Sequence, residues 1–362
     1  MFDKNYDLWY YVIDIITYLL STMSNIYKIA EIVGVSPATV SRALSNKGYV
    51  SVATKEKILK VAKELNYVPN SVARSLRSKR TLTLGVLIPN LDNPFYSSYV
   101  RGIQDVAELN NFIVAIFNTD RKVEKELSYL RIVDERKLEG VIVGREGWSE
   151  EGNEFLNYLV KKGIIVITIG HRIKNVDEVY VDTESGAYQA TSYLLKLGYS
   201  RIAYIGAPLS RNIGIGRLKG YKKALLEWGI IPDESLIVEG DLTEVCGYNI
   251  IKDLWTKPLK PDGVLAANDL VAIGVILGAR ELDIKIPEEL GIIGFDNIRE
   301  SALIIPSLTT VSQPAYEIGR VACEMFINRR NNPNLPLQSI TLLPRLVIRD
   351  STKNIEIKMK GG

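Results

Sequence analysis

The feature that most constrains this chain is a pair of short helices predicted over residues 25–44. Asn25 is a good N-cap for the first helix, because its side-chain oxygen can accept from the free amides of the first turn. Apolar residues then recur at helical spacing, and Gly34 supplies the left-handed residue that ends the helix. Ser36 and Pro37 begin the second helix, since proline costs nothing at the first helical position. The pattern predicts a helix-turn-helix, whose second helix is the kind that lies in a DNA major groove, with an ordinary helical hairpin as the alternative.

Positive charge is concentrated around this hairpin. The whole chain of 362 residues carries a net charge of only +3. Residues 23–81 hold eleven Lys and Arg against three Glu, a net charge of +8, whereas residues 1–22 carry −2. A basic module on a mildly acidic body is typical of a nucleic-acid-binding domain joined to something else.

Cysteine and histidine are too few for several kinds of site. The chain has two cysteines, Cys246 and Cys323, at no metal-binding spacing, and a single histidine, His171. A disulfide framework and a Cys/His zinc site are therefore not expected. We expect the protein in the cytoplasm.

The first 22 residues are apolar and aromatic, with interrupting aspartates. The run from Leu8 to Leu20 is too short to span a membrane, and it lacks the basic start and small-residue cleavage site of a signal peptide. The preferred interpretation is that translation starts at Met23. The alternative is an amphipathic helix that packs on a partner, and the intact mass of the native protein distinguishes the two.

A third helix and a basic stretch follow the hairpin. Ser51 caps a helix predicted from Val52 to about Leu65, with apolar side chains on one face and lysines on the other. Residues 70–80, N-S-V-A-R-S-L-R-S-K-R, are basic and helix-capable. A helix of about nine residues is marginal alone in water, so this one should form only when something holds it. A charged linker is the alternative.

From Thr83 onward, apolar runs alternate with helical patterns. Strands are predicted at 83–89, 112–117, 140–143, 165–169, 202–206, 236–239, 263–266 and 292–295. Helices are predicted at 94–109, 122–136, 150–162, 185–197, 213–228, 245–254 and 269–280. Alternation of this kind implies parallel sheets with helices on both faces, and its two series predict two doubly wound subdomains. In such sheets, ligands bind beyond the carboxyl ends of the strands.

These motifs together resemble the lactose-repressor (LacI/GalR) family of bacterial transcription regulators, over roughly residues 25–351. The likeness lies in I-A-E-I-V-G-V-S-P-A-T-V-S-R-A-L at 29–44, L-N-Y-V-P-N-S-V-A-R-S-L at 65–76, D-N-P-F-Y at 92–96, R-L-K-G-Y at 217–221, A-A-N-D at 266–269, G-F-D-N at 294–297 and S-L-T-T-V-S-Q-P at 307–314. Several independent motifs in the right order are far more specific than the helix-turn-helix alone.

The resemblance implies an α/β protein with an N-terminal all-α DNA-binding domain, a hinge helix and a periplasmic-binding-protein-like body. The expected parts are an extension at 1–22, the helix-turn-helix domain at 23–68, the hinge at 69–81, one subdomain at 82–181 plus 312–340, the other at 182–311 plus 341–352, and a tail at 353–362. The implied function is repression of carbohydrate-utilisation genes by a homodimer on a near-palindromic operator. A small-molecule effector, no cofactor and no membrane are expected.

The resemblance also assigns DNA contacts. Bases are read from Pro37, Ala38 and Arg42, and the Arg42 fork can pair bidentately with guanine O6 and N7. Phosphate contacts, which position without specifying, are expected from Asn25, Ser36, Thr39 and Ser41.

The stretch at 70–78 matches the family's hinge helix, which folds when two copies meet in the minor groove. Leu76 falls where the family inserts a leucine between the central base pairs and kinks the duplex. DNA contacts in this segment are implied for Asn70, Ala73, Leu76 and Arg77.

Effector-binding positions are implied in the body. They are Phe95, Arg217, Asn268, Asp269 and Asp296, in which carboxylates and an Arg fork would bind vicinal hydroxyls and a ring would cover an apolar sugar face. Each has a structural alternative. Asn268 may be read as the cap of the helix at 269–280, Asp296 as closing a turn with Asn297, and Phe95 as plain core.

Two departures from the family pattern bear on the effector. Gly170, His171 and Arg172 stand where many members carry Asp, so His171 either takes over a polar contact or is a surface histidine. Leu242 stands where an aromatic residue is often found, which removes one stacking ring.

A third departure keeps a purine-like effector open. The run P-L-S-R-N-I-G-I-G-R at 208–217 closely resembles the purine repressor, which uses the first Arg of the run on its corepressor. This likeness adds Arg211 to the effector-binding positions. Ile213 replaces a hydrogen-bonding residue there and argues against a purine, so a sugar or sugar phosphate is preferred.

Two other classes of protein fit the sequence less well. A dinucleotide enzyme is disfavoured because the glycines at 214, 216 and 220 lack the spacing of a phosphate-binding loop and no acidic residue follows to hold a ribose. The sequence also shows no nucleophile–base pair. A transport-associated solute-binding protein would need a signal peptide and would lack residues 25–80.

Overall fold

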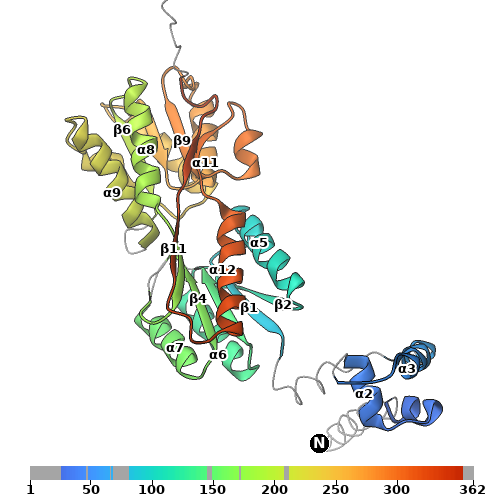
Figure 1. Cartoon of the computed structure of the whole chain (residues 1–362). Helices are drawn as coiled ribbons and strands as arrows, with labels where there is room; N and C mark the ends of the chain where they lie inside the picture. Colours follow the sequence, from blue (N-terminus) through green and yellow to red (C-terminus); the bar gives the residue numbers. More distant parts are fainter. Residues whose placement is uncertain are drawn as a thin grey trace, which may run out of the picture. The chain divides into compact units, whose positions relative to one another are not determined.

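The computed structural model describes residues 26–45, 48–65, 67, 81–144, 149–170, 173–207 and 212–353. The chain divides into two compact units, Met1–Thr81 and Leu82–Gly362 (Figure 1). The predictions for Asn25, for residues 1–22 and for the stretch at 70–80 concern residues outside those described.

The described residues of unit 1 form three helices around a small apolar core. They are a helix at 26–33, α2 (Pro37–Ser45) and α3 (Val52–Glu64). Ile29, Val40 and Ile58, one from each helix, have no exposed surface and hold the three together. Gly34 has a φ of +74°, the left-handed conformation that the turn requires. The predicted helix-turn-helix and third helix are confirmed.

The part of unit 2 that the structure describes forms two six-stranded sheets. The first sheet has the order β11-β5-β4-β3-β1-β2 and is parallel throughout. Its strands are β1 (Thr83–Ile88), β2 (Ile113–Asn118), β3 (Gly140–Gly144), β4 (Ile165–Ile169), β5 (Asp177–Val181) and β11 (Ser339–Leu342). The strands predicted near 83, 112, 140 and 165 are confirmed.

Side-chain alternation along β1 explains why this sheet is covered on both faces. Leu84, Val86 and Ile88 point into a core shared with α5 (Phe95–Leu109) and α12 (Ala315–Asn331). Leu87 points to the other face, into a core shared with α6 (Val123–Glu135) and α7 (Glu150–Lys161). A continuous apolar strand therefore requires helices on both sides.

The second sheet repeats the plan with the order β12-β10-β9-β8-β6-β7. Its strands are β6 (Ile202–Gly206), β7 (Ile237–Glu239), β8 (Gly263–Ala266), β9 (Gly291–Asp296), β10 (Thr309–Ser312) and β12 (Arg345–Val347), of which β12 runs antiparallel to β10. One face carries α8 (Thr183–Lys196) and α9 (Asn212–Glu227), and the other carries α10 (Glu244–Thr256) and α11 (Asp269–Glu281) (Figure 1).

The chain passes from one sheet to the other three times. The connections follow β5, follow β10, and join β11 to β12. The elements around them, which are β5, β10, α12, β11 and β12, were not predicted by hydrophobic alternation. No helix in the described part of the chain is long and apolar enough to cross a membrane.

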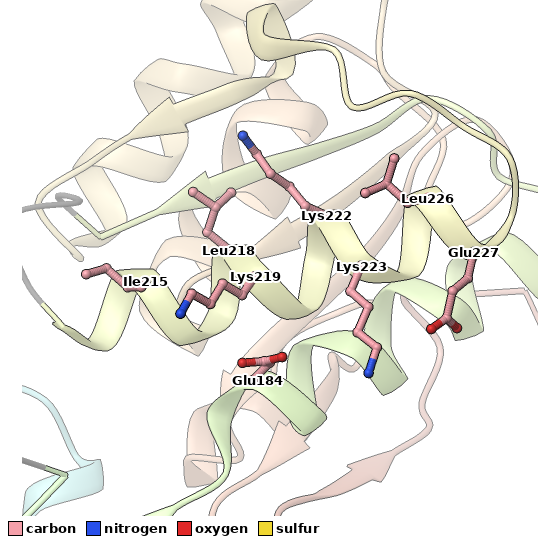
Figure 2. Close-up of a pocket in the computed structure, with 8 residues that line it drawn as sticks. All are labelled: Glu184, Ile215, Leu218, Lys219, Lys222, Lys223, Leu226 and Glu227. Atoms are coloured by element: carbon pink, nitrogen blue, oxygen red, sulfur yellow. The ribbon is translucent and has the colours of Figure 1, made fainter.

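Helix α9 has two contrasting faces. Its outer face lines a surface groove of about 720 Å³, in which Ile215, Leu218 and Leu226 lie among lysines (Figure 2). Arg217 is two residues from both Ile215 and Lys219, a spacing that corresponds to about 200° of rotation around the helix. It therefore falls on the side of α9 opposite these two groove residues. Arg217 is consequently buried, with 2% of its surface exposed.

Candidate functional sites

Helix α2 in unit 1 carries most of the predicted base-reading and phosphate-contact residues. Val40 and Ala43 are buried against the other helices, whereas Ser36, Ala38 and Arg42 are exposed. Pro37, Thr39 and Ser41 are partly exposed. The helix therefore has one face fixed in the core and another face open to a partner.

Local hydrogen bonds shape the beginning of α2. The Ser36 hydroxyl accepts from the Thr39 amide at 3.2 Å, which confirms the predicted cap. The Arg42 Nε donates to the Ala38 carbonyl, and an Arg42 terminal nitrogen donates to the Thr39 hydroxyl, both at 3.4 Å. Bonds of this length lie at the weak end of the range for hydrogen bonds.

In unit 2, a buried polar cluster lies at the carboxyl ends of β1 and β9. Asp296 ends β9, and one of its oxygens accepts from Gln313 Nε2 at 2.6 Å. Its other oxygen accepts from Asn93 Nδ2 at 3.5 Å, and Asn93 follows β1 of the first sheet. Arg217 Nη2 lies 3.8 Å from Asp296 Oδ1. We call Asn93, Arg217, Asp296 and Gln313 the junction cluster, because its contacts join the two sheets.

Arg217 is the least satisfied member of the junction cluster. Its Nη1 donates to the Ala267 carbonyl at 2.6 Å, and its guanidinium carbon lies 4.1 Å from the centre of the Phe295 ring. Its Nε is buried and has no hydrogen-bond partner among the described residues. An unmatched buried donor of this kind costs about 1–3 kcal/mol, which an added acceptor would recover.

Asn268 begins α11 beside this cluster. Its side-chain oxygen accepts from the Val271 amide at 2.8 Å, so the capping alternative is confirmed. Its amide nitrogen donates to the Leu242 carbonyl at 3.1 Å. Leu242, with a φ of +71°, is buried with Ala207 and Ala267, so an aliphatic patch stands where the family often has a ring.

Asp269 lies near Asp296 of the junction cluster and has no exposed surface. One of its oxygens accepts from the Thr310 hydroxyl, and the other accepts from the Ile298 amide at 2.8 Å. Burial, together with the nearby charge of Asp296, raises its pKa to about 8. The carboxyl therefore holds a proton at neutral pH and ties α11 and β10 to the loop after β9.

Phe95 is the first residue of α5 and is partly buried. Its ring meets the Tyr96 ring edge-on, with centroids 5.2 Å apart, and packs against the core of the first sheet. Its backbone amide donates to the Asn93 side chain at 2.9 Å, which places it next to the junction cluster. His171 and Arg211 lie outside the described residues.

Three residues of this region were not singled out from the sequence as effector-binding positions. Asn93 and Gln313 hold the Asp296 carboxylate, and Phe295 lies against Arg217. Each lies within a stretch that carried the resemblance, namely D-N-P-F-Y, S-L-T-T-V-S-Q-P and G-F-D-N. Their position at the end of a strand or in the loop that follows one was the available signal. The described residues contain no group of His, Cys, Asp or Glu suited to a metal ion.

Comparison with known proteins agrees with this architecture. Residues 25–70 match the model of bacterial regulatory proteins of the lacI family, and residues 191–352 match a periplasmic binding protein-like domain. The chain is 36% identical over 332 residues to catabolite control protein A of Priestia megaterium, across 91% of this chain and 99% of that protein. It is 31% identical over 333 residues to the transcriptional repressor PurR of Vibrio atlanticus, across 92% of this chain and 100% of the relative.

Solved structures give the same result. The lac repressor dimer bound to operator and the anti-inducer ONPF matches with a TM-score of 0.80 and 25% identity, across 90% of this chain and 98% of the other. A regulator from Enterococcus faecium with bound ribose matches with a TM-score of 0.68 and 30% identity, across 75% of this chain and 98% of the other.

A helix-turn-helix unit followed by a two-sheet, periplasmic binding protein-like body defines a class of bacterial regulatory proteins. The identity and coverage of the relatives specify the family within that class. The chain belongs to the lacI family of bacterial regulatory proteins.

Proposed function

We propose that the chain is a ligand-responsive, sequence-specific DNA-binding repressor whose effector is a sugar bound at the junction cluster. The observation that carries this proposal is Arg217, whose buried Nε has no partner among the described residues. A buried cation held 3.8 Å from a carboxylate, with an unused N–H, is poised to donate a hydrogen bond to a hydroxyl oxygen.

The chemistry of the cluster favours a neutral polyol. Arg217 and Asn93 donate, and Asp296 accepts, so neighbouring sugar hydroxyls can use both functions at once. The 3.5 Å bond between Asn93 and Asp296 is weak and is the contact that a hydroxyl would replace. Because Asn93 comes from one sheet and Asp296 from the other, the same ligand would bridge both subdomains.

The remaining predicted effector residues take different parts in this proposal. Asn268 and Asp269 support the site indirectly, because their side chains make hydrogen bonds to backbone groups of the protein. Phe95 borders the site through its amide contact with Asn93. His171 and Arg211 follow β4 and β6 in the chain and stay predicted contacts.

Two comparisons support the class of effector and the mode of DNA binding. The Enterococcus faecium regulator holds ribose, and the lac repressor is a dimer on its operator. The purine alternative rests on the likeness of the run at 208–217 and on Arg211. A near-palindromic operator read by two copies of α2 follows from the symmetry of a dimer.

The DNA-binding part of the proposal assigns base contacts to Pro37, Ala38 and Arg42. Phosphate contacts go to Ser36, Thr39 and Ser41, together with Asn25. The hinge residues Asn70, Ala73, Leu76 and Arg77 add minor-groove contacts. The edge strand β2 leaves Ile113 and Ile116 67% and 40% exposed, which suits association with a second copy.

The test is thermal unfolding of the full chain against a panel of mono- and disaccharides, sugar phosphates, nucleosides and purine bases. A ligand at about 100 times its Kd should add about 2.7 kcal/mol, a shift of several degrees. A sugar that raises the Tm supports the proposal. A purine moves the site toward Arg211, and no shift with any member contradicts a small-molecule effector of these classes.

A further inference from the structure

The segment that presents Asp296 is held in an uncommon backbone conformation. Asp296 has a φ of +118° and Asn297 a φ of +62°, two successive non-glycine residues in the left-handed half of backbone space. Such residues persist only where the surrounding structure fixes them, and they gather at binding sites. The position of the Asp296 carboxylate therefore depends on whatever holds residues 296–298.

One contact to this segment comes from the last connection between the sheets. Arg349 lies just after β12, and one of its terminal nitrogens donates to Asn297 Oδ1 at 2.7 Å. Its other terminal nitrogen donates to the Leu308 carbonyl at 2.7 Å and to the Ser301 hydroxyl at 3.2 Å. The planar fork thus spans the loop between β9 and β10 from one end to the other.

Arg349 is itself held at its backbone. Its amide donates to the Thr309 hydroxyl at 2.8 Å, and that hydroxyl donates to the Arg349 carbonyl at 3.1 Å. On the far side, Asn297 Nδ2 donates to the Ser312 hydroxyl at 3.2 Å, directly beside Gln313. Arg349 consequently links the chain after β12 rigidly to β10, through its backbone, and to the segment that carries Asp296, through its guanidinium.

We propose that Arg349 is a positioning residue for effector binding. Through Asn297 it fixes the strained segment 296–298, so that the Asp296 carboxylate faces Arg217 and Asn93. The inference rests on the proposed function for its link to effector affinity. It adds that the third connection between the sheets, in which the chain returns to the second sheet at β12 (Arg345–Val347), sets the position of the Asp296 carboxylate.

Two variants separate positioning from general stability. Arg349→Met removes every bond of the fork, including those that support the loop at Leu308. Asn297→Gly removes the link to Arg349 together with the bond to Ser312, and it keeps the fork's bonds at Leu308 and Ser301. Glycine tolerates the φ of +62°. Arg345→Met is the matched control, because Arg345 is an exposed arginine at the start of β12, shortly before Arg349 in the chain.

The first readout is hydrogen exchange of the Ile298 amide, which donates to Asp269 Oδ2 at 2.8 Å and needs no ligand. We expect exchange at least tenfold faster in Arg349→Met and in Asn297→Gly than in Arg345→Met. Equal exchange in Asn297→Gly and Arg345→Met overturns the proposal, even if Arg349→Met is less stable.

The second readout is binding of ribose and the other panel sugars. For a sugar that stabilises the unmodified chain, we expect its Kd to rise at least tenfold in Asn297→Gly and to stay within twofold in Arg345→Met. An unchanged Kd in Asn297→Gly overturns the positioning role. If no sugar binds the unmodified chain, the proposed function fails separately, while the exchange rates still decide whether Arg349 fixes the segment.

Discussion

The two candidate sites of this molecule are built in opposite ways. Helix α2 leaves its predicted base-reading residues exposed or partly exposed, and the Arg42 bonds to Ala38 and Thr39 are long. The junction cluster is buried, with 2–9% of each residue exposed, and its members contact one another. A surface that reads a large polyanion can rely on side chains that rearrange, whereas a site for a small neutral ligand needs groups fixed before binding.

The largest expected difference between the sites lies in stability. Arg217→Leu leaves the Asp296 carboxylate without its buried cation, so we expect the free energy of unfolding to fall by about 3–5 kcal/mol. Lys219→Leu, two residues along α9 on the groove face, should change it by about 0.5 kcal/mol or less. Urea unfolding measures both. Similar losses in the two variants would contradict the buried role of Arg217.

The buried site should also respond to pH through Asp269. Its pKa of about 8 lies above the value of 3.8 for an unperturbed Asp, so the folded state binds a proton that the unfolded state releases. Stability from this group is complete below about pH 4, and it falls as the pH rises toward about 8. The slope is about 1.4 kcal/mol per pH unit inside that window.

Asp269→Asn removes this slope, because the amide does not titrate. The loss in the free energy of unfolding that Asp269→Asn causes, relative to the unmodified chain, should therefore shrink by about 2–3 kcal/mol between pH 5.5 and 7.5. Urea unfolding at the two pH values gives the answer. The charged neighbours Asp296 and Arg349 remain in both proteins, so parallel pH curves would show that Asp269 does not titrate in this range.

The exposed site should show the reverse pattern. Arg42→Ala should leave the unfolding curve nearly unchanged and weaken DNA binding by about 1–3 kcal/mol, with relaxed preference at one base pair. Lys57→Ala, an exposed cation on α3, should at most weaken binding evenly across sequences. Competition with a pool of duplexes measures both effects. An unchanged sequence preference in Arg42→Ala would reject its base-reading role.

The smallest expected effect concerns the cap of α2. Ser36→Ala removes the acceptor for the Thr39 amide and should cost about 1 kcal/mol of unit 1 stability. Circular dichroism of a Ser36→Ala chain during heating measures the loss, with Ser36→Gly expected to cost only a few tenths. A cost equal to that of Arg217→Leu would remove the contrast between the two sites.

Much of the fold follows from local pattern. Capping residues and apolar spacing predicted the three helices described in unit 1. Alternation of strands and helices predicted the first four strands of each sheet along the chain, but not β5 or β10. The strands near the three connections were not predicted because strands follow one another there without an intervening α-helix, as β5 follows β4 and β12 follows β11. β12 has three residues, and its pairing with β10 is fixed only by the returning tail.

The candidate site was predictable only in part. The resemblance identified Arg217, Asn268, Asp269 and Asp296, and the structure brings them together. Asn93 lies 203 residues from Asp296, and no spacing rule indicates that contact. Whether a polar residue such as Asp269 points at a ligand or is held within the fold depends on neighbours from other strands, here Thr310 and Ile298.

The most direct test of this account is a DNA-binding titration with and without a sugar that stabilises the chain. The duplex is selected from a random pool by the unmodified protein, and the sugar is used at saturation. We predict that the sugar changes the DNA affinity of the unmodified chain at least fivefold, in either direction, because coupling between two sites is reciprocal. Equal affinities with and without the sugar would contradict the coupling of the junction cluster to DNA binding.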